Sequence, residues 1–412
     1  MSNFLQLIAE ISIILLAAKA AGYISTRLKQ PSVFGELLVG VLLGPSLLDI
    51  THLGFVTNTH LAETIHEFGE IGVLLLMFLA GLELHIKELT KNTRVALLAG
   101  VMGVLLPVGL GILFGEFLNI PFSNALFLGL TLGATSVSIS AQVLIELQVL
   151  RTRVGLGLLG AAVFDDILVI LILSSAVAFL SGGGSFTDII WVFARMVIYL
   201  ALATAVGLWL LPRVVRITQR LKISQGLTTL ALVVLLGYGL AAELVGGMAA
   251  ITGTFLAGLM FGRTPEKSVI ETNLHSIAYA FFVPIFFVSI GLNVNLRLLG
   301  VESIWIFLGL SVIAILGKII GSGSGALMAK FTPRESLQIG IGMVSRGEVG
   351  LIIANIGANA GYITDELLTI IVGMILVTTL VTPPMLRASF RTPKKPQGES
   401  TIPPQTEIKE SV

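Results

Sequence analysis

The sequence predicts an all-α polytopic membrane protein, and three observations support this fold class. Hydrophobic residues make up 55% of the 412 residues and charged residues only 12%, whereas a soluble chain carries about 25% charge. Apolar runs long enough to cross a bilayer core of about 30 Å recur along nearly the whole chain. Basic residues gather in every second loop between these runs. Together these patterns predict helical membrane spans joined by short loops.

Thirteen spans are predicted from hydropathy, with boundaries set by glycine, proline and charged residues. The N-terminal run has neither the basic region nor the small-residue cleavage site of a signal peptide, so it is predicted to be the first span. The chain after residue 390 is polar and rich in proline, a composition that predicts disorder. We therefore expect a membrane domain over 1–390 and a disordered cytoplasmic tail over 391–412. The predicted spans are 4–26, 31–48, 66–84, 94–118, 123–147, 153–180, 187–211, 225–243, 246–262, 272–294, 301–329, 334–360 and 363–388.

Charge in the predicted loops sets the orientation, because basic residues favour the cytoplasmic side of a membrane. The pattern predicts an N-terminus outside and a C-terminus inside, in an inner or plasma membrane or another energised membrane. The inside loops then contain Arg27, Lys29, Lys87, Lys91, Arg94, Arg151, Arg153, Arg213, Arg216, Arg220, Lys222, Arg263, Lys267, Lys330 and Arg334. The outside loops contain Arg297 and the acidic residues Asp49, Glu63, Glu67, Glu116, Asp188 and Glu302.

Four basic residues fall inside predicted spans. Lys19 lies near a cytoplasmic end, so we expect its ammonium group to snorkel to the interface. Arg195 lies about nine residues into its span, which favours a structural pair or an interfacial anchor. Lys318 and Arg346 lie deeper, where charge is costly and is usually retained for function.

The two halves of the chain have the same layout. Spans four to six comprise a long helix, an interrupted helix at LGLTLGATSVSISAQ and a helix with two adjacent aspartates. Spans eleven to thirteen comprise a long helix, an interrupted helix at IGIGMVSRGEVGLII and a final helix. Corresponding spans are an odd number apart, so the second copy is inverted in the membrane. Spans one to six thus form a first repeat, span seven a linker and spans eight to thirteen an inverted repeat, a pattern typical of secondary transporters.

Polar residues on four of these spans lie at a common depth. Each lies between about 11 and 14 residues from an end of its predicted span, at about 1.5 Å per residue. Chance placement would scatter such residues over all depths. They are Thr135 and Ser136 in span five, Asp165 and Asp166 in span six, Lys318 in span eleven, and Arg346 and Glu348 in span twelve.

Asp165 and Asp166 are the most costly of these residues, because burial of one ionised carboxylate already costs several kcal/mol. Neighbours on a helix point about 100° apart, so one aspartate can face a cavity while the other pairs with a neighbour. Lys318 lies at the same depth, and a carboxylate partner keeps a buried lysine charged. A cation and protons would then compete for the same carboxylates. A static ion pair between helices is the alternative, but it leaves the second aspartate unexplained.

The interrupted helices supply further candidates for ion binding. Four glycines tolerate the irregular backbone of the interruptions: Gly129, Gly133, Gly347 and Gly350. Broken helices free carbonyl groups that can coordinate a cation. The hydroxyl groups of Thr135, Ser136 and Ser138 suit a hard cation such as Na⁺, with hydrogen bonding between helices as the alternative. Arg346 and Glu348 either compensate the opposed helix dipoles or take part in binding directly.

Four motifs resemble the monovalent cation:proton antiporter-2 family, the bacterial Na⁺/H⁺ and K⁺/H⁺ antiporters of the NapA and KefC kind. The motifs are GAAVFDDILVIL, ILGKIIGS, GATSVSISAQ and GMVSRGEVGLIIA, and the resemblance covers about residues 4–388. It implies an NhaA/NapA-like antiporter fold, which is a homodimer of thirteen-helix chains with crossing broken helices. It also implies a dimerisation domain and a mobile six-helix core that moves like an elevator. Thr135 and Ser136 would lie at the helix crossover, and Glu348 near the ion.

Within this family the chain resembles the NapA branch. KefC-like members have Gln-Asp where this chain has Asp165 and Asp166, and they carry a nucleotide-binding domain after the membrane part. The resemblance implies that Asp166 binds the Na⁺ or K⁺ ion and that Asp165 pairs with Lys318. Two aspartates with this lysine resemble the electrogenic pattern of two H⁺ per Na⁺. We expect Na⁺ or Li⁺ exchange for H⁺, with K⁺/H⁺ exchange as the alternative.

Other classes of function fit these residues less well. An intramembrane aspartyl protease needs its two aspartates on different helices, whereas Asp165 and Asp166 are adjacent, so we expect no enzyme. A cation channel would need a continuous polar pore. A sensor that binds ions without transport remains an alternative. A transporter of lipids or organic anions would have several midplane cations and no aspartate pair.

The residues give no sign of a cofactor or a nucleic-acid partner. The chain has no cysteine, which excludes disulfides and thiolate metal sites. The five histidines lie in predicted loops or near span ends and do not converge on a metal site. They are His52, His60, His66, His85 and His275. His52, His60 and His66 face the outside, where we expect solvated side chains, with pH sensing as the alternative.

Overall fold

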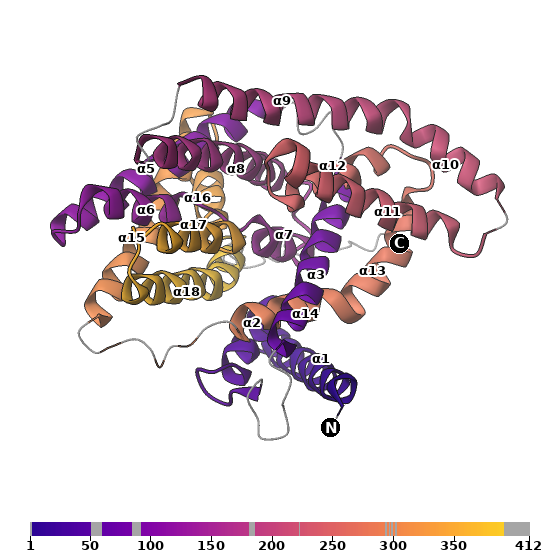
Figure 1. Ribbon diagram of the computed structural model, residues 1–412. Helices are drawn as coiled ribbons and strands as arrows, with labels where there is room; N and C mark the ends of the chain where they lie inside the picture. Colours follow the sequence, from indigo (N-terminus) through magenta and orange to yellow (C-terminus); the bar gives the residue numbers. More distant parts are fainter. Residues whose placement is uncertain are drawn as a thin grey trace, which may run out of the picture.

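The computed structural model describes residues 2–50, 60–84, 92–180, 186–221, 223–292, 295, 297, 300 and 303–390 (Figure 1). Within this part of the chain every regular element is a helix. Among the described residues, ten helices are long and apolar enough to cross a membrane, and three shorter apolar helices are Ser32–Leu43, Ala250–Phe261 and Val349–Asn359. Each of the thirteen predicted ranges overlaps one of these apolar helices. The all-α membrane fold is confirmed, and the number of membrane crossings stays a prediction.

The elements follow one another along the chain with short connections. The α-helices are α1 (Asn3–Arg27), α2 (Ser32–Leu43), α3 (Leu61–Glu83), α5 (Thr93–Phe117), α6 (Phe122–Gly133), α7 (Val137–Glu146), α8 (Arg153–Leu180), α9 (Phe186–Trp209), α10 (Leu211–Arg220), α11 (Gly226–Ala241), α12 (Ala250–Phe261), α13 (Lys267–Ile277), α14 (Val283–Leu292), α15 (Ile304–Met328), α16 (Pro333–Gly342), α17 (Glu348–Asn359) and α18 (Asp365–Phe390). The described part of the chain also has two π-helical segments, η2 (Ala242–Gly246) and η3 (Ala278–Phe282).

Some residues with predicted roles lie outside the described part of the chain. They are His52, His85, Lys87, Lys91, Lys222, Glu302 and the predicted tail 391–412. The backbones of Asp188 and Glu348 lie in helices α9 and α17, but their side chains are likewise outside the described part.

Several helix ends differ from the predicted ranges, and α2 and α3 are two examples. α2 ends at Leu43 rather than at residue 48, because Pro45 cannot continue the helix. α3 begins at Leu61 rather than at residue 66. Glu63 and Glu67 were predicted to lie in an outside loop. In the structure they lie in the first turns of α3. Acidic residues are favourable there because the N-terminal end of a helix carries partial positive charge.

α10 is an amphipathic helix where a basic inside loop was predicted. Leu211 and Val215 are buried, whereas Arg213, Arg216 and Arg220 are exposed on the opposite face. The prediction missed this helix because its apolar face has too few residues to raise the mean hydropathy of a window as long as a membrane span. The basic loop after the seventh predicted span is therefore a helix that extends from the end of α9 (Figure 1).

The helices form two sets (Figure 1). The crossover set comprises α5 to α8 and α15 to α18, and in it α5 packs against α6, α8 and α15. The flanking set comprises α1 to α3 and α9 to α14 with both π-helical segments, and in it α3 packs against α12 and α14. α7 lies at the centre of Figure 1 and contacts α8 and α18 on one side and α2 and α3 on the other. The junction between the sets thus passes along α7.

A basic side chain from another helix binds each π-helical segment. The guanidinium group of Arg195 on α9 donates to the carbonyl oxygens of Leu244 and Val245 in η2. Lys19 on α1 is exposed, and its Nζ donates to the carbonyl oxygen of Tyr279 in η3 at 2.8 Å. A π turn shifts carbonyl groups out of the regular hydrogen-bond ladder, and these cations satisfy them. Lys19 therefore binds backbone where snorkelling alone was predicted.

Helices α3 and α12 approach so closely that two glycines are required at their contact. A Cβ on Gly81 would lie 2.1 Å from the carbonyl oxygen of Phe255. A Cβ on Gly258 would lie 2.0 Å from the carbonyl oxygen of Phe78. Small residues at helix contacts allow backbones to pack closely inside a membrane. This contact holds α12, which carries part of the site described below, against α3.

Gly258→Ala is expected to lower the free energy of unfolding by about 1–3 kcal/mol, because the added methyl group forces α3 and α12 apart. Thermal unfolding of the purified protein in detergent measures the change. Gly237→Ala on α11 is the matched control, since a Cβ there meets no atom within 4 Å. The control should be as stable as the wild type or slightly more so, because alanine favours helix by about 0.5–1 kcal/mol over glycine. Equal stability of the two variants would contradict the close contact.

Candidate functional site

Two interrupted helices cross inside the crossover set. One interruption separates α6 from α7, and the other separates α16 from α17. The backbone N–H of Ser136 donates to the carbonyl oxygen of Ser345 at 2.8 Å, and the Ser345 hydroxyl donates to the carbonyl oxygen of Ser136 at 2.7 Å. A Cβ on Gly347 would lie 2.7 Å from Ser136 Oγ, so glycine is needed for this approach. The two links therefore bind each other directly.

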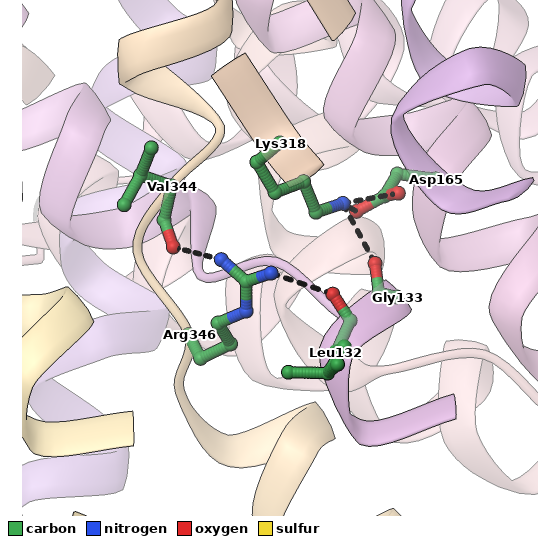
Figure 2. Close-up of polar contacts among 6 residues, drawn as sticks. All are labelled: Leu132, Gly133, Asp165, Lys318, Val344 and Arg346. Atoms are coloured by element: carbon green, nitrogen blue, oxygen red, sulfur yellow. Dashed lines mark hydrogen bonds and ion pairs between the residues drawn. The ribbon is translucent and has the colours of Figure 1, made fainter. Parts of the chain in front are cut away.

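Arg346 lies in the second link and is fully buried. Its Nη2 donates to the carbonyl oxygen of Leu132 in the last turn of α6, at 2.6 Å, and its Nη1 donates to the carbonyl oxygen of Val344 (Figure 2). Its own carbonyl oxygen accepts a hydrogen bond of 2.6 Å from Thr379 Oγ1 on α18. The guanidinium group thus satisfies carbonyl groups that the interruptions leave without a helical partner.

Lys318 on α15 forms an ion pair with Asp165 on α8, and both side chains have 0% exposure. Lys318 Nζ lies 2.9 Å from Asp165 Oδ1 and 3.2 Å from Oδ2. The same ammonium group donates to the carbonyl oxygen of Gly133, the last residue of α6, at 2.6 Å (Figure 2). A buried pair of this kind is held by its hydrogen bonds as well as by charge, because both ions have left water.

The C-terminal end of α6 therefore receives two positive charges. Lys318 contacts Gly133, and Arg346 contacts Leu132, one residue earlier (Figure 2). The last carbonyl groups of a helix carry partial negative charge, which cations stabilise. Asp165 adds a full negative charge beside the same helix end. The interruption is thus a compact cluster of opposite charges that contains no water-exposed ion.

Asp166 lies on α8 next to Asp165 and is 5% exposed. Its carboxylate is directed to the junction between the two sets, where Thr252 Oγ1 on α12 donates to Asp166 Oδ2 at 3.4 Å. A cavity of about 10 Å³ adjoins both side chains. Sequence reasoning missed Thr252 as a neighbour of Asp166. Hydropathy does not fix where a helix as short as α12 begins, so the depth of Thr252 in the membrane could not be counted.

The remaining predicted residues of the first interruption are also buried. Thr135 lies in the link, and Ser138 lies in the first turn of α7. The hydroxyl groups of Ser136 and Ser138 are 3.1 Å apart. These three residues lie beside the helix crossing, while the structure leaves the side chain of Glu348 undescribed.

The described residues contain no group of three histidine, aspartate or glutamate side chains that could hold a metal ion. His60 Nδ1 lies 3.1 Å from Glu63 and His66 Nε2 lies 3.5 Å from Glu70, in exposed pairs near the start of α3. The ring of His275 stacks on that of Tyr279. These three histidines are apart from the aspartates.

A cavity of about 390 Å³ leads to the helix crossing from one side of the molecule. Its lining includes His66 and Glu70 on α3, and it reaches Ser136 and Gly347 in the two links. The first two residues lie near the N-terminal end of α3, and the last two lie at the crossing. The crossing is therefore approached by open space from the side on which α3 begins.

Hydrogen bonds tie the C-terminal half of α7 to the flanking set on the opposite side. Ser32 at the start of α2 donates to Glu146 through its backbone N–H, at 2.8 Å, and through its hydroxyl group. Tyr279 in η3 donates to Gln142 Oε1 at 2.7 Å, and Gln142 Nε2 donates to Glu146 at 3.0 Å. We refer to the contacts of Gln142 and Glu146 with Ser32 and Tyr279 as the α7 clasp. Sequence reasoning missed it, because polar residues near span ends are common.

Interrupted helices that cross beside buried charges define a class of ion-coupled membrane transporters. The chain belongs to the transmembrane sodium/hydrogen exchanger family, whose family model matches residues 12–391. This match agrees with the antiporter resemblance of the sequence motifs at the level of the family, while membership of the NapA branch stays a prediction.

Similar proteins include three with named activities. The Na⁺/H⁺-K⁺ antiporter GerN of Bacillus cereus is 42% identical over 381 residues, which is 92% of this chain and 95% of the relative. The Na⁺/H⁺ antiporter of Enterococcus hirae is 36% identical over 384 residues, 93% of this chain and 98% of the relative. The structure of the sodium proton antiporter MjNhaP1 from Methanocaldococcus jannaschii matches with a TM-score of 0.67 at 20% identity. The match covers 93% of this chain and 97% of the MjNhaP1 chain, so the two proteins share a fold.

Lys318→Met is expected to destabilise the protein by about 3–5 kcal/mol, because Asp165 keeps a buried charge without its lysine. The double variant Asp165→Asn/Lys318→Met should regain most of this loss, since neither ion then remains. Unfolding of the purified variants in detergent gives both values. A single variant as stable as the wild type would show that the pair does not hold α8 and α15 together.

Proposed function

We propose that this protein is a secondary active antiporter that exchanges a monovalent cation, Na⁺ or Li⁺, for protons. The proposal depends on one observation, the adjacent aspartates of α8 in two different environments. Asp165 is paired with Lys318, whereas Asp166 borders a small cavity at the junction of the helix sets. Family membership supports the proposal, as do the Na⁺/H⁺ antiporters among the similar proteins.

In the proposed mechanism the transported cation and protons compete for the same carboxylates. Asp166 binds Na⁺ in one half of the cycle and a proton in the other. Cation binding weakens the hold of Asp165 on Lys318, and a proton then leaves this pair. Two protons would exchange for one cation, which makes transport electrogenic. No cofactor or bond-making chemistry takes part.

The residues of the helix crossing have supporting roles in this proposal. Thr135 and Ser136 offer hydroxyl or carbonyl oxygen atoms to the ion, and Glu348 lies near it. Arg346 balances the negative end of α6 when the charge at the aspartates changes, and Ser138 maintains the start of α7. Hard cations prefer oxygen ligands of this kind.

The proposed architecture is a homodimer of chains that each cross the membrane thirteen times. Spans one to six and eight to thirteen form inverted repeats, residues 1–390 form the membrane domain, and 391–412 form a cytoplasmic tail. The N-terminus lies outside and the C-terminus inside, in the inner or plasma membrane. The crossover set then corresponds to the mobile core, which moves like an elevator against the flanking set.

K⁺ is the second candidate for the transported cation. The name of GerN, the relative with 42% identity, includes K⁺ beside Na⁺. A channel or a non-transporting sensor would not convert a pH gradient into cation movement, so an exchange assay separates these classes as well.

Asp166→Asn is expected to abolish exchange, because asparagine cannot cycle between a proton and a cation. The assay uses the purified protein in proteoliposomes under an imposed pH gradient, with Na⁺, Li⁺ and K⁺ compared in parallel. Asp365→Asn in the exposed first turn of α18 is the matched control and should exchange at the wild-type rate. Exchange by Asp166→Asn at the wild-type rate would contradict the mechanism. In the wild type, the ion that collapses the pH gradient at the lowest concentration identifies the substrate.

An elevator movement must break the α7 clasp. In the proposed orientation, the cavity that reaches Ser136 opens outside and the clasp closes the inside. Tyr279→Phe removes one hydrogen bond, worth about 1 kcal/mol, so the outward-open population should fall roughly fivefold relative to the inward-open one. Tyr199→Phe is the matched control, because Tyr199 bonds to Tyr238 within the flanking set.

The chain has no cysteine, so Asn355→Cys in the cavity lining provides a single reporter for this prediction. Its labelling by an impermeant thiol reagent from outside should slow in the Tyr279→Phe background and stay unchanged with Tyr199→Phe. Equal labelling rates in all backgrounds would exclude the clasp from the movement.

A further inference from the structure

Asp166 has a partner from the other helix set. Thr252 lies in the first turn of α12, in the flanking set, and its Oγ1 is 3.4 Å from Asp166 Oδ2. Both side chains are buried, with 5% exposure each. This hydrogen bond therefore crosses the junction that an elevator movement would displace.

The backbone before α12 is built to bring its first turn to this position. The π-helical segment η2 ends at Gly246, and Gly247 has a φ of 63°, in the left-handed region that glycine adopts without strain. Arg195 occupies the carbonyl groups of η2, and the first turn of α12 follows within three residues of Gly247. The backbone N–H of Thr252 bonds to the carbonyl oxygen of Ala249, so its hydroxyl group is the part that is available to Asp166.

The cavity beside Asp166 and Thr252 has the size of one small ligand. The cavity has a volume of about 10 Å³, close to the room that one water molecule needs. Its other walls are apolar: Met77, Val137, Leu159, Ala162, Val163, Ile251 and Phe255. Polar atoms thus face this space from two side chains, one in each helix set. An ion or water there would find its oxygen ligands at Asp166 and Thr252.

We propose that Thr252 is a ligand of the cation at Asp166, so that the binding site is completed by the flanking set. This inference rests on the proposed function. A hydroxyl group can act in both states of the site. Its oxygen lone pairs bind the cation when the ion is present, and its proton is donated to the Asp166 carboxylate when the ion is absent. When the crossover set moves, Asp166 leaves Thr252 behind and the cation loses this ligand. Thr252 therefore sets the cation affinity of one state of the cycle and not of the other.

The test compares three variants in the proteoliposome assay, with the Na⁺ concentration for half-maximal exchange as the measured value. Thr252→Val keeps the shape of the side chain without its hydroxyl group and should raise this concentration about five- to tenfold. Thr252→Ser keeps the hydroxyl group and should stay within about twofold of the wild type. Thr254→Val is the matched control, because the Thr254 hydroxyl bonds to the carbonyl oxygen of Ile251 within α12.

Binding without transport gives a second readout. Na⁺ should raise the thermal unfolding temperature of the wild type and of Thr254→Val, and higher Na⁺ should be needed for the same rise in Thr252→Val. A merely structural role would lower stability without changing the Na⁺ concentration required. If Thr252→Val does not fold, Thr252→Ala provides the same comparison.

The outcomes separate this inference from the proposed function. Absence of cation/proton exchange by the wild type would overturn both. Exchange by the wild type with the same half-maximal Na⁺ concentration in Thr252→Val would overturn the role of Thr252 alone. Loss of affinity in Thr252→Ser equal to that in Thr252→Val would also overturn it, because the hydroxyl group would then not be the cause.

Discussion

The cluster of charges at the C-terminal end of α6 is the interaction on which the site depends. Lys318 and Arg346 donate to the last carbonyl groups of this helix, and Lys318 also pairs with Asp165. A helix end without hydrogen bonds, a buried ammonium group and a buried carboxylate would each be unfavourable alone. In the cluster the two cations bind the helix end, and the ammonium group and the carboxylate bind each other. Asp166 lies next to this cluster on α8, beside a cavity.

In the proposed mechanism, the cluster moves relative to the flanking set along the junction between the helix sets. The crossing links are bound to each other within the crossover set, through Ser136 and Ser345. Apolar side chains of both sets pack together at the junction, and the hydrogen bonds that cross it include Thr252 to Asp166 and the α7 clasp. Polar contacts between packed apolar helices break at a modest cost, since each is worth about 1 kcal/mol. The proposed movement therefore keeps the hydrogen bonds of the crossing intact and breaks those that cross the junction.

Part of the site could be predicted from the sequence because a regular helix converts residue number into depth. Counting along two long spans brings Lys318 and Asp165 to one level, and in the structure they are 2.9 Å apart. The same method fails at Thr252, since the π turn of η2 and the left-handed Gly247 shift the start of α12. It also fails at Lys19, whose partner is a carbonyl group that a π turn releases.

The sequence by itself determined the all-α membrane fold, the positions of the apolar helices and the residues that carry charge into the bilayer. These depend on local composition, which decides whether a segment leaves water. Only the tertiary structure decided which aspartate pairs with the lysine, which carbonyl groups the cations bind and that Thr252 meets Asp166. Such choices depend on the rotation and the irregular turns of helices that are distant in the chain. Direction about a helix axis is fixed by packing, and hydropathy carries no record of it.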